Sequence, residues 1–148
     1  MLRRILLNSF ILLFFFAYIT KAVSAQNDPI THVWLNTEKT AKIEIYQEGD
    51  GKYYGKVVWL KKPNINGKPK IDIYNPDKTK RNRPFMGMVV LKGFVKTATG
   101  VYENGTVYDP TTGKTYRCKM FVSGEKLHLR GYWGISLIGK SAVWTKAE

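Results

Sequence analysis

The feature that most constrains this chain is a series of short segments in which apolar and polar side chains alternate. In one of them, Ile43 and Ile45 alternate with Lys42 and Glu44. Successive side chains of a β-strand point to opposite faces, so a period of two is typical of a strand with one buried face. No segment after residue 25 has the spacing of an amphipathic helix. The pattern therefore predicts an all-β fold.

Turn residues separate these segments at regular intervals. Strands are predicted over 33–35, 41–47, 53–60, 114–122, 126–130 and 141–146, with turns at 48–51, 109–113 and 123–125. The dipeptide Asn104-Gly105 predicts a further two-residue hairpin loop, because both central positions of such a loop need a positive φ. Together these signals predict a single antiparallel barrel of about eight to nine short strands, of the size found in lipocalins and other calycins. The strands are too short, and too rich in lysine on one face, for a barrel that crosses an outer membrane.

One segment breaks the pattern. Residues 61–84 contain four prolines and show no alternation. Irregular segments of this length are uncommon in compact domains and are often functional. We therefore predict one long loop, 61–84, between two parts of the barrel.

The first 25 residues have the three parts of an export signal. Arg3 and Arg4 precede an apolar run that ends at Ile19, and the small residues Val23-Ser24-Ala25 follow. This order predicts a helical signal peptide over 1–25 that is removed before Gln26, leaving 26–148 as one domain in the periplasm or outside the cell. A retained anchor is the alternative, but the unbroken apolar run is shorter than the roughly 20 residues that a spanning helix needs.

The net charge indicates which binding partners are favoured, and the cysteine content shows whether a disulfide can stabilise the fold. The chain has 24 Lys and Arg against 11 Asp and Glu, a net charge of +13. Such a surface favours anionic partners, and export argues against nucleic acid. Cys118 is the one cysteine, so the chain cannot form an internal disulfide. Because Cys118 alternates with Arg117 and Lys119, we expect its side chain to be buried.

Several motifs resemble a known family. They are Asp72-Ile73-Tyr74-Asn75-Pro76-Asp77, Arg81-Asn82-Arg83-Pro84, Tyr108-Asp109-Pro110 and Leu129-Arg130-Gly131-Tyr132. In this order they resemble DUF2147, a family of uncharacterised exported bacterial proteins. The resemblance implies a small lipocalin-like β-barrel and no particular reaction. His32 and Tyr102 depart from the pattern expected of the family, where we expect Gly and Trp.

Two groups of residues are candidates for binding. The loop supplies Asp72, Asn75, Asp77, Arg81 and Arg83, and we expect its arginines to pair with Asp72, Asp77 or Asp109 and so hold the loop against the barrel. The alternative is a rim that binds anions through the guanidinium groups. The second group comprises Asp109, Tyr116, Tyr132 and Trp133, whose aromatic members either fill the barrel or line a cavity in it.

These features support three functional hypotheses. The leading one is a binding protein for a small apolar or amphipathic ligand, or for an anionic component of the cell envelope. The alternatives are an envelope interaction module without a small ligand, and an envelope hydrolase that uses Asp77 or Asp109. The sequence contains no Cys and His set of the kind that binds zinc and no nucleophile motif. It therefore predicts no catalytic residue, metal or cofactor, and it leaves the oligomeric state open.

Overall fold

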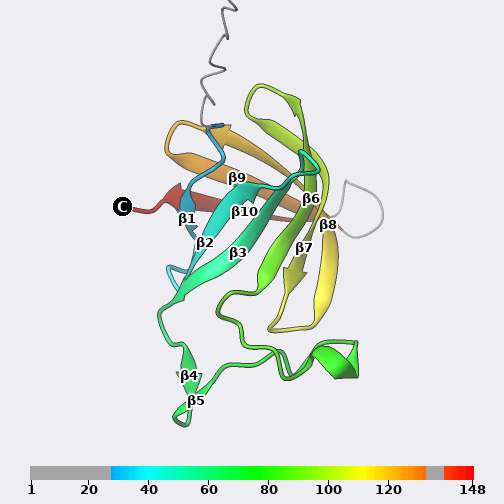
Figure 1. Ribbon diagram of the computed structural model, residues 1–148. Coiled ribbons are helices and arrows are strands. Elements are labelled where there is room, and N and C mark those ends of the chain that lie inside the picture. The colour runs from blue at the N-terminus through cyan, green and yellow to red at the C-terminus, as the bar shows by residue number, and fades with distance from the viewer. Residues whose placement is uncertain (1–27, 133–138) are drawn as a thin grey trace, which may run out of the picture.

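The protein is a closed antiparallel β-barrel. The computed structural model describes residues 28–132 and 139–148 (Figure 1). The barrel strands are β1 (Val33–Leu35), β2 (Ala41–Gln47), β3 (Tyr53–Leu60), β6 (Val89–Ala98), β7 (Val101–Asp109), β8 (Lys114–Ser123), β9 (Lys126–Tyr132) and β10 (Gly139–Lys146). Their order is β1-β10-β9-β8-β7-β6-β3-β2, and β1 also pairs with β2, which closes the sheet. The predicted all-β barrel and its strand number are confirmed.

The alternation of the sequence produces the core. Ile43 and Ile45 of β2, and Leu127 and Leu129 of β9, are all buried. Burial of each such side chain stabilises the folded state by about 1.5–3 kcal/mol. The inward faces of the strands therefore supply most of the hydrophobic driving force for folding. Cys118 is fully buried, as its position in the alternation predicts.

The prediction of a hairpin loop at Asn104-Gly105 is wrong. Both residues lie within β7, where the pairing with β8 shifts register between Tyr102 and Gly105. Asn104 has the predicted positive φ of 62°, but it forms a β-bulge instead of a turn. Gly105 is required for packing, because a Cβ there would lie 2.4 Å from the ring of the buried Phe94.

One end of the barrel, which we call the closed end, is covered by the chain before β1. Ile30 is fully buried there, and its carbonyl accepts a hydrogen bond of 2.8 Å from the Trp34 indole. Asp28 accepts hydrogen bonds from the hydroxyls of Tyr53 and Tyr102 and from the Lys96 ammonium. These contacts hold the segment across the strand ends.

The long segment between β3 and β6 extends from the other end of the barrel (Figure 1). It contains a small hairpin, β4 (Asn64–Ile65) and β5 (Lys68–Pro69), and the 3₁₀ helix η1 (Lys78–Lys80). The predicted loop is therefore only partly irregular. Asn66 and Gly67, both with positive φ, form the tight turn that joins β4 to β5. Among the described residues, no helix is long and apolar enough to span a membrane.

Candidate functional site

The interior of the barrel contains a cavity of about 500 Å³, which we call the interior cavity. It lies between strands β7 to β10. Its lining residues are Val107, Asp109, Tyr116, Cys118, Leu129, Gly131, Tyr132, Lys140, Ala142 and Trp144. Most of these side chains are apolar, so the cavity can hold apolar groups away from water.

The interior cavity exists because small residues lie here at positions where the closed end of the barrel has large aromatic ones. Large aromatic side chains such as Trp34, Phe94 and Tyr102 are fully buried toward the closed end. At the cavity, Gly131 has no side chain and Ala142 has a small one. A Cβ built on Gly131 would meet its nearest side-chain neighbours, Tyr116 and Val107, at 3.7 Å, so the missing side chain is not demanded by a close contact.

Cys118 lies in the wall of the interior cavity as an apolar group. Burial raises the pKa of its thiol to about 12, so the thiol stays protonated at neutral pH. A protonated thiol is a poor nucleophile. Cys118 therefore contributes packing surface to the cavity.

Two charged side chains, Asp109 and Lys140, stand at the polar edge of the same cavity. Burial raises the pKa of Asp109, but hydrogen bonds from Thr111 and Thr112 and the charge of Lys140 outweigh it and leave the pKa below its ordinary value. The two hydroxyls bind the Asp109 carboxylate at 2.6 and 2.9 Å. Within the described residues, Lys140 has no ion-pair partner within 4 Å. Lys140 is therefore the group that remains available to a ligand.

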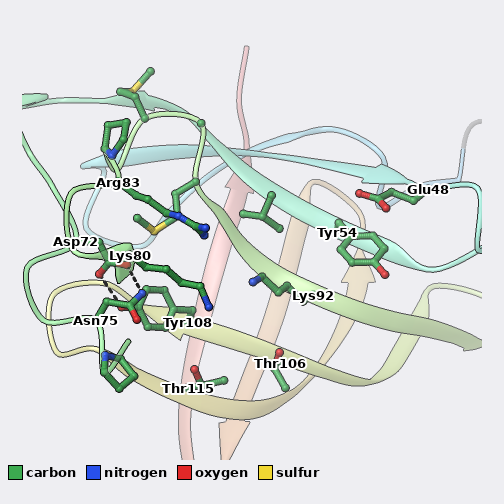
Figure 2. Close-up of a pocket in the computed structure, with 16 residues that line it drawn as sticks. Glu48, Tyr54, Asp72, Asn75, Lys80, Arg83, Lys92, Thr106, Tyr108 and Thr115 are labelled. Atoms are coloured by element: carbon green, nitrogen blue, oxygen red, sulfur yellow. Dashed lines mark hydrogen bonds between the residues drawn. The ribbon is translucent and has the colours of Figure 1, made fainter. Parts of the chain in front are cut away.

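A second depression lies outside the barrel wall. This outer groove, of about 790 Å³, runs between the segment 72–89 and the outer faces of β3, β6, β7 and β8 (Figure 2). Lys80, Arg83 and Lys92 contribute its cations, and Tyr54, Thr106 and Thr115 line it from the barrel side.

A buried carboxylate fastens the loop to the barrel. Asp72 is 1% exposed and accepts hydrogen bonds of 2.6 Å from the Asn75 amide and from the Tyr108 hydroxyl on β7. Burial and the hydrogen bond to Asp72 raise the pKa of Tyr108, which keeps its hydroxyl protonated as a donor. Gly113 permits a further contact, since a Cβ there would lie 1.9 Å from the Tyr74 carbonyl oxygen. The two sequence motifs that contain Asp72 and Tyr108 thus meet in one anchor.

The expectation that the loop arginines pair with aspartates is wrong. Arg81 donates through Nε to the Asn75 carbonyl at 2.8 Å, and within the described residues neither Arg81 nor Arg83 forms an ion pair. Neutral donors, including Tyr108, already occupy the Asp72 oxygens. Asp77 instead caps η1 and pairs with Lys80 at 2.8 Å. The arginine pairing was plausible from charge alone, but the tyrosine and amide donors supply the hydrogen bonds of Asp72.

The predicted site residues therefore separate into two sets on opposite sides of the barrel wall. Asp109, Tyr116 and Tyr132 line the interior cavity, whereas Asp72, Asn75 and Arg83 line the outer groove. Asp77 and Arg81 stabilise the loop, and Trp133 lies outside the described residues.

The sequence reasoning missed Lys140 in the cavity and Lys92 in the groove. Alternation offered a signal for Lys140, which lies on the same face as Ala142 and the buried Trp144. No comparable signal placed Lys92 opposite a loop that is distant in the chain.

The family model for an uncharacterised protein conserved in bacteria, DUF2147, matches residues 33–146. The chain belongs to the DUF2147 family. The anchor between Asp72 and Tyr108 and both candidate sites lie within the matched region. The positions that depart from the expected DUF2147 pattern lie toward the closed end, where Tyr102 donates its hydroxyl to Asp28 and His32 packs edge-on against Trp34.

A solved structure supports the fold. A Helicobacter pylori protein, described as belonging to the lipocalin family, superposes with a TM-score of 0.71 and 23% sequence identity, over 80% of this chain and 83% of that one. At this identity the likeness shows a lipocalin-like fold for this DUF2147 chain and nothing finer. No curated protein matches the sequence.

Proposed function

We propose that the barrel binds a small anionic amphiphile, with its apolar part in the interior cavity and its charged group at Lys140. The observation that carries the proposal is the cavity of about 500 Å³ inside the closed barrel. Its volume lies in the range of about 300–1,000 Å³ that is typical of small-molecule sites. A lipocalin-like fold is consistent with such a ligand.

The lining explains why the ligand is amphipathic. Val107, Leu129 and Trp144 offer apolar surface, and burial of each ligand methylene there contributes about 0.8 kcal/mol. Polar groups occur mainly at one edge. Two threonine hydroxyls hold the Asp109 carboxylate, and among the described residues Lys140 has no ion-pair partner within 4 Å, so its ammonium can pair with an anionic head group.

As part of the same proposal, residues 1–25 act as an export signal and the domain works outside the cytoplasm. The leader over 1–25 would deliver the domain to the periplasm or the extracellular space, where a closed barrel can shield an apolar ligand from water.

The two alternatives have less support. A ligand-free interaction module would be favoured by a completely filled barrel, whereas the interior leaves space near Gly131. For a hydrolase, Asp77 and Asp109 could act as an acid–base pair only in one cleft, but Asp77 caps η1 outside the barrel and Asp109 lines the interior cavity.

A chain-length series tests the proposal. Straight-chain alkyl carboxylates are titrated into the purified protein, and binding is followed by calorimetry and by the fluorescence of Trp144, with Trp144→Phe to assign the signal. We expect the affinity to rise about fourfold per methylene until the cavity is full, because about 0.8 kcal/mol corresponds to roughly that factor. Alcohols of the same chain length, which lack the charge for Lys140, should bind about tenfold more weakly. Affinity that is independent of chain length would refute the proposal.

A further inference from the structure

The outer groove is a cationic site, and the ligand proposed for the interior cavity does not occupy it. Lys80, Arg83 and Lys92 come from the loop and from β6, and Figure 2 shows their side chains directed toward the same part of the groove. Within the described residues, the side chains of Arg83 and Lys92 have neither an ion-pair partner nor a hydrogen-bond partner. Lys80 forms an ion pair of 2.8 Å with Asp77. Like charges gathered in one groove attract an anion.

The backbone fixes the cations on the loop side in place. The Arg83 carbonyl accepts a hydrogen bond of 2.9 Å from the Asp72 amide, and the Arg83 amide donates to the Lys80 carbonyl at 3.1 Å. Asp72 in turn is bound to Tyr108 on the barrel. The positions of Lys80 and Arg83 are therefore tied to β7, so less of the binding energy is lost in ordering the loop.

Acidic groups offset these cations only in part. Asp72 is buried, and its oxygens accept hydrogen bonds from Asn75 and Tyr108. Glu48 lies near Tyr54, and Figure 2 shows both away from Lys80 and Arg83. Asp77 pairs with Lys80, so the positive charge of the groove comes mainly from Arg83 and Lys92.

The rest of the lining indicates what kind of anion fits. Thr106 and Thr115 offer hydroxyl groups from the barrel side, and Tyr54 adds an aromatic ring. A volume of about 790 Å³ is larger than an isolated phosphate needs and lies in the small-molecule range. The planar fork of Arg83 suits a phosphate or a carboxylate, and the lysines act as point charges beside it.

We propose that the outer groove is a second binding site, for a sugar that carries phosphate or carboxylate groups. The anionic group lies between Lys80, Arg83 and Lys92, and the sugar hydroxyls face Thr106 and Thr115. This site is independent of the ligand proposed for the interior cavity, since the barrel wall separates the two.

The test compares four probes by calorimetry and by amide chemical shifts in NMR spectra of the purified protein. The probes are glucose 6-phosphate, a galacturonate trisaccharide, glucose and inorganic phosphate. We expect at least one charged sugar to bind more tightly than both glucose and phosphate, with shifts at Lys92 and Thr106. Which charged sugar binds identifies the anionic group. Binding of neither, or binding of phosphate as tight as that of the sugars, would overturn the proposal.

A pair of double variants tests the site itself. Arg83→Gln with Lys92→Gln removes two charges from the groove and should weaken binding of the charged sugar about tenfold or more at low ionic strength. The control, Lys119→Gln with Lys126→Gln, removes two charges from exposed positions outside the groove. It should change the affinity less than threefold. Equal losses in both double variants would show a general effect of net charge and overturn the assignment. Unchanged melting temperatures verify that both proteins are folded.

Discussion

Replacing Asp28 with alanine will lower the free energy of unfolding by about 3 kcal/mol. The wild-type carboxylate is 13% exposed and accepts hydrogen bonds from Tyr53, Tyr102 and Lys96. Its removal leaves two tyrosine hydroxyls at the closed end without their acceptor, and it releases the segment that carries Ile30. Chemical denaturation measures the loss.

Asp50→Ala is the matched control. Asp50 also accepts a tyrosine hydroxyl, that of Tyr54 at 2.7 Å, but this pair is exposed. Water can replace an exposed hydrogen bond, so we expect a loss below about 1 kcal/mol. Equal costs for the two alanine variants would show that Asp28 does not hold the closed end.

The pH dependence of stability has a predictable sign at this cluster. Burial raises the pKa of Asp28, but the hydrogen bonds that it accepts outweigh this effect and bring the pKa below 3.8. Its contribution is therefore present above about pH 4 and is lost as the pH falls through the folded-state pKa. Burial and the bond to Asp28 raise the pKa of Tyr53 from 10.0 to about 12, so this contribution is present below pH 10 and lost as the pH rises further. Both limbs should be shallower in the Asp28→Ala variant.

Gly131→Phe will reduce the affinity for an alkyl carboxylate about 100-fold while the barrel stays folded. A Cβ at Gly131 meets its neighbours only at ordinary contact distances of 3.7–3.9 Å, and β9 there does not require a positive φ. The ring can therefore enter the interior cavity and occupy the volume of several ligand methylenes. The ligand then loses the binding free energy that burial of those methylenes contributes. Calorimetric titration measures the affinity, and thermal unfolding verifies the fold.

Gly131→Ala separates loss of volume from loss of the glycine. The added methyl group occupies little of the cavity, so we expect the affinity to stay within about threefold of the wild type. If the phenylalanine variant bound the ligand as tightly as the alanine variant, the ligand would have to lie elsewhere.

The parts of the fold that depend on local periodicity could be predicted from the sequence. Ile43 and Ile45 face inward because strand side chains alternate, and the same alternation correctly predicted that Cys118 is buried. Asn104-Gly105 was misassigned because a positive φ serves a bulge as well as a turn. The deciding fact, the packing of Phe94 against Gly105, joins residues of two neighbouring strands and cannot be read from the dipeptide.

The candidate sites were harder to predict because their residues come together only in three dimensions. Charge alone favoured pairing between the loop arginines and Asp72, yet Tyr108 and Asn75 supply that carboxylate with its hydrogen bonds. The interior cavity depends on which strand positions are small, and one sequence does not say which small residues face each other.

The central claim, that the apolar part of an anionic amphiphile occupies the interior of the barrel, is tested most directly by isotope-edited NMR. Nuclear Overhauser effects are recorded between the chain of a bound alkyl carboxylate and the methyl groups of the labelled protein. The account predicts contacts to Val107, Leu129 and Ala142, which line the interior cavity. Contacts only to Val95 and Val143, which are exposed, would place the ligand outside the barrel and contradict the account.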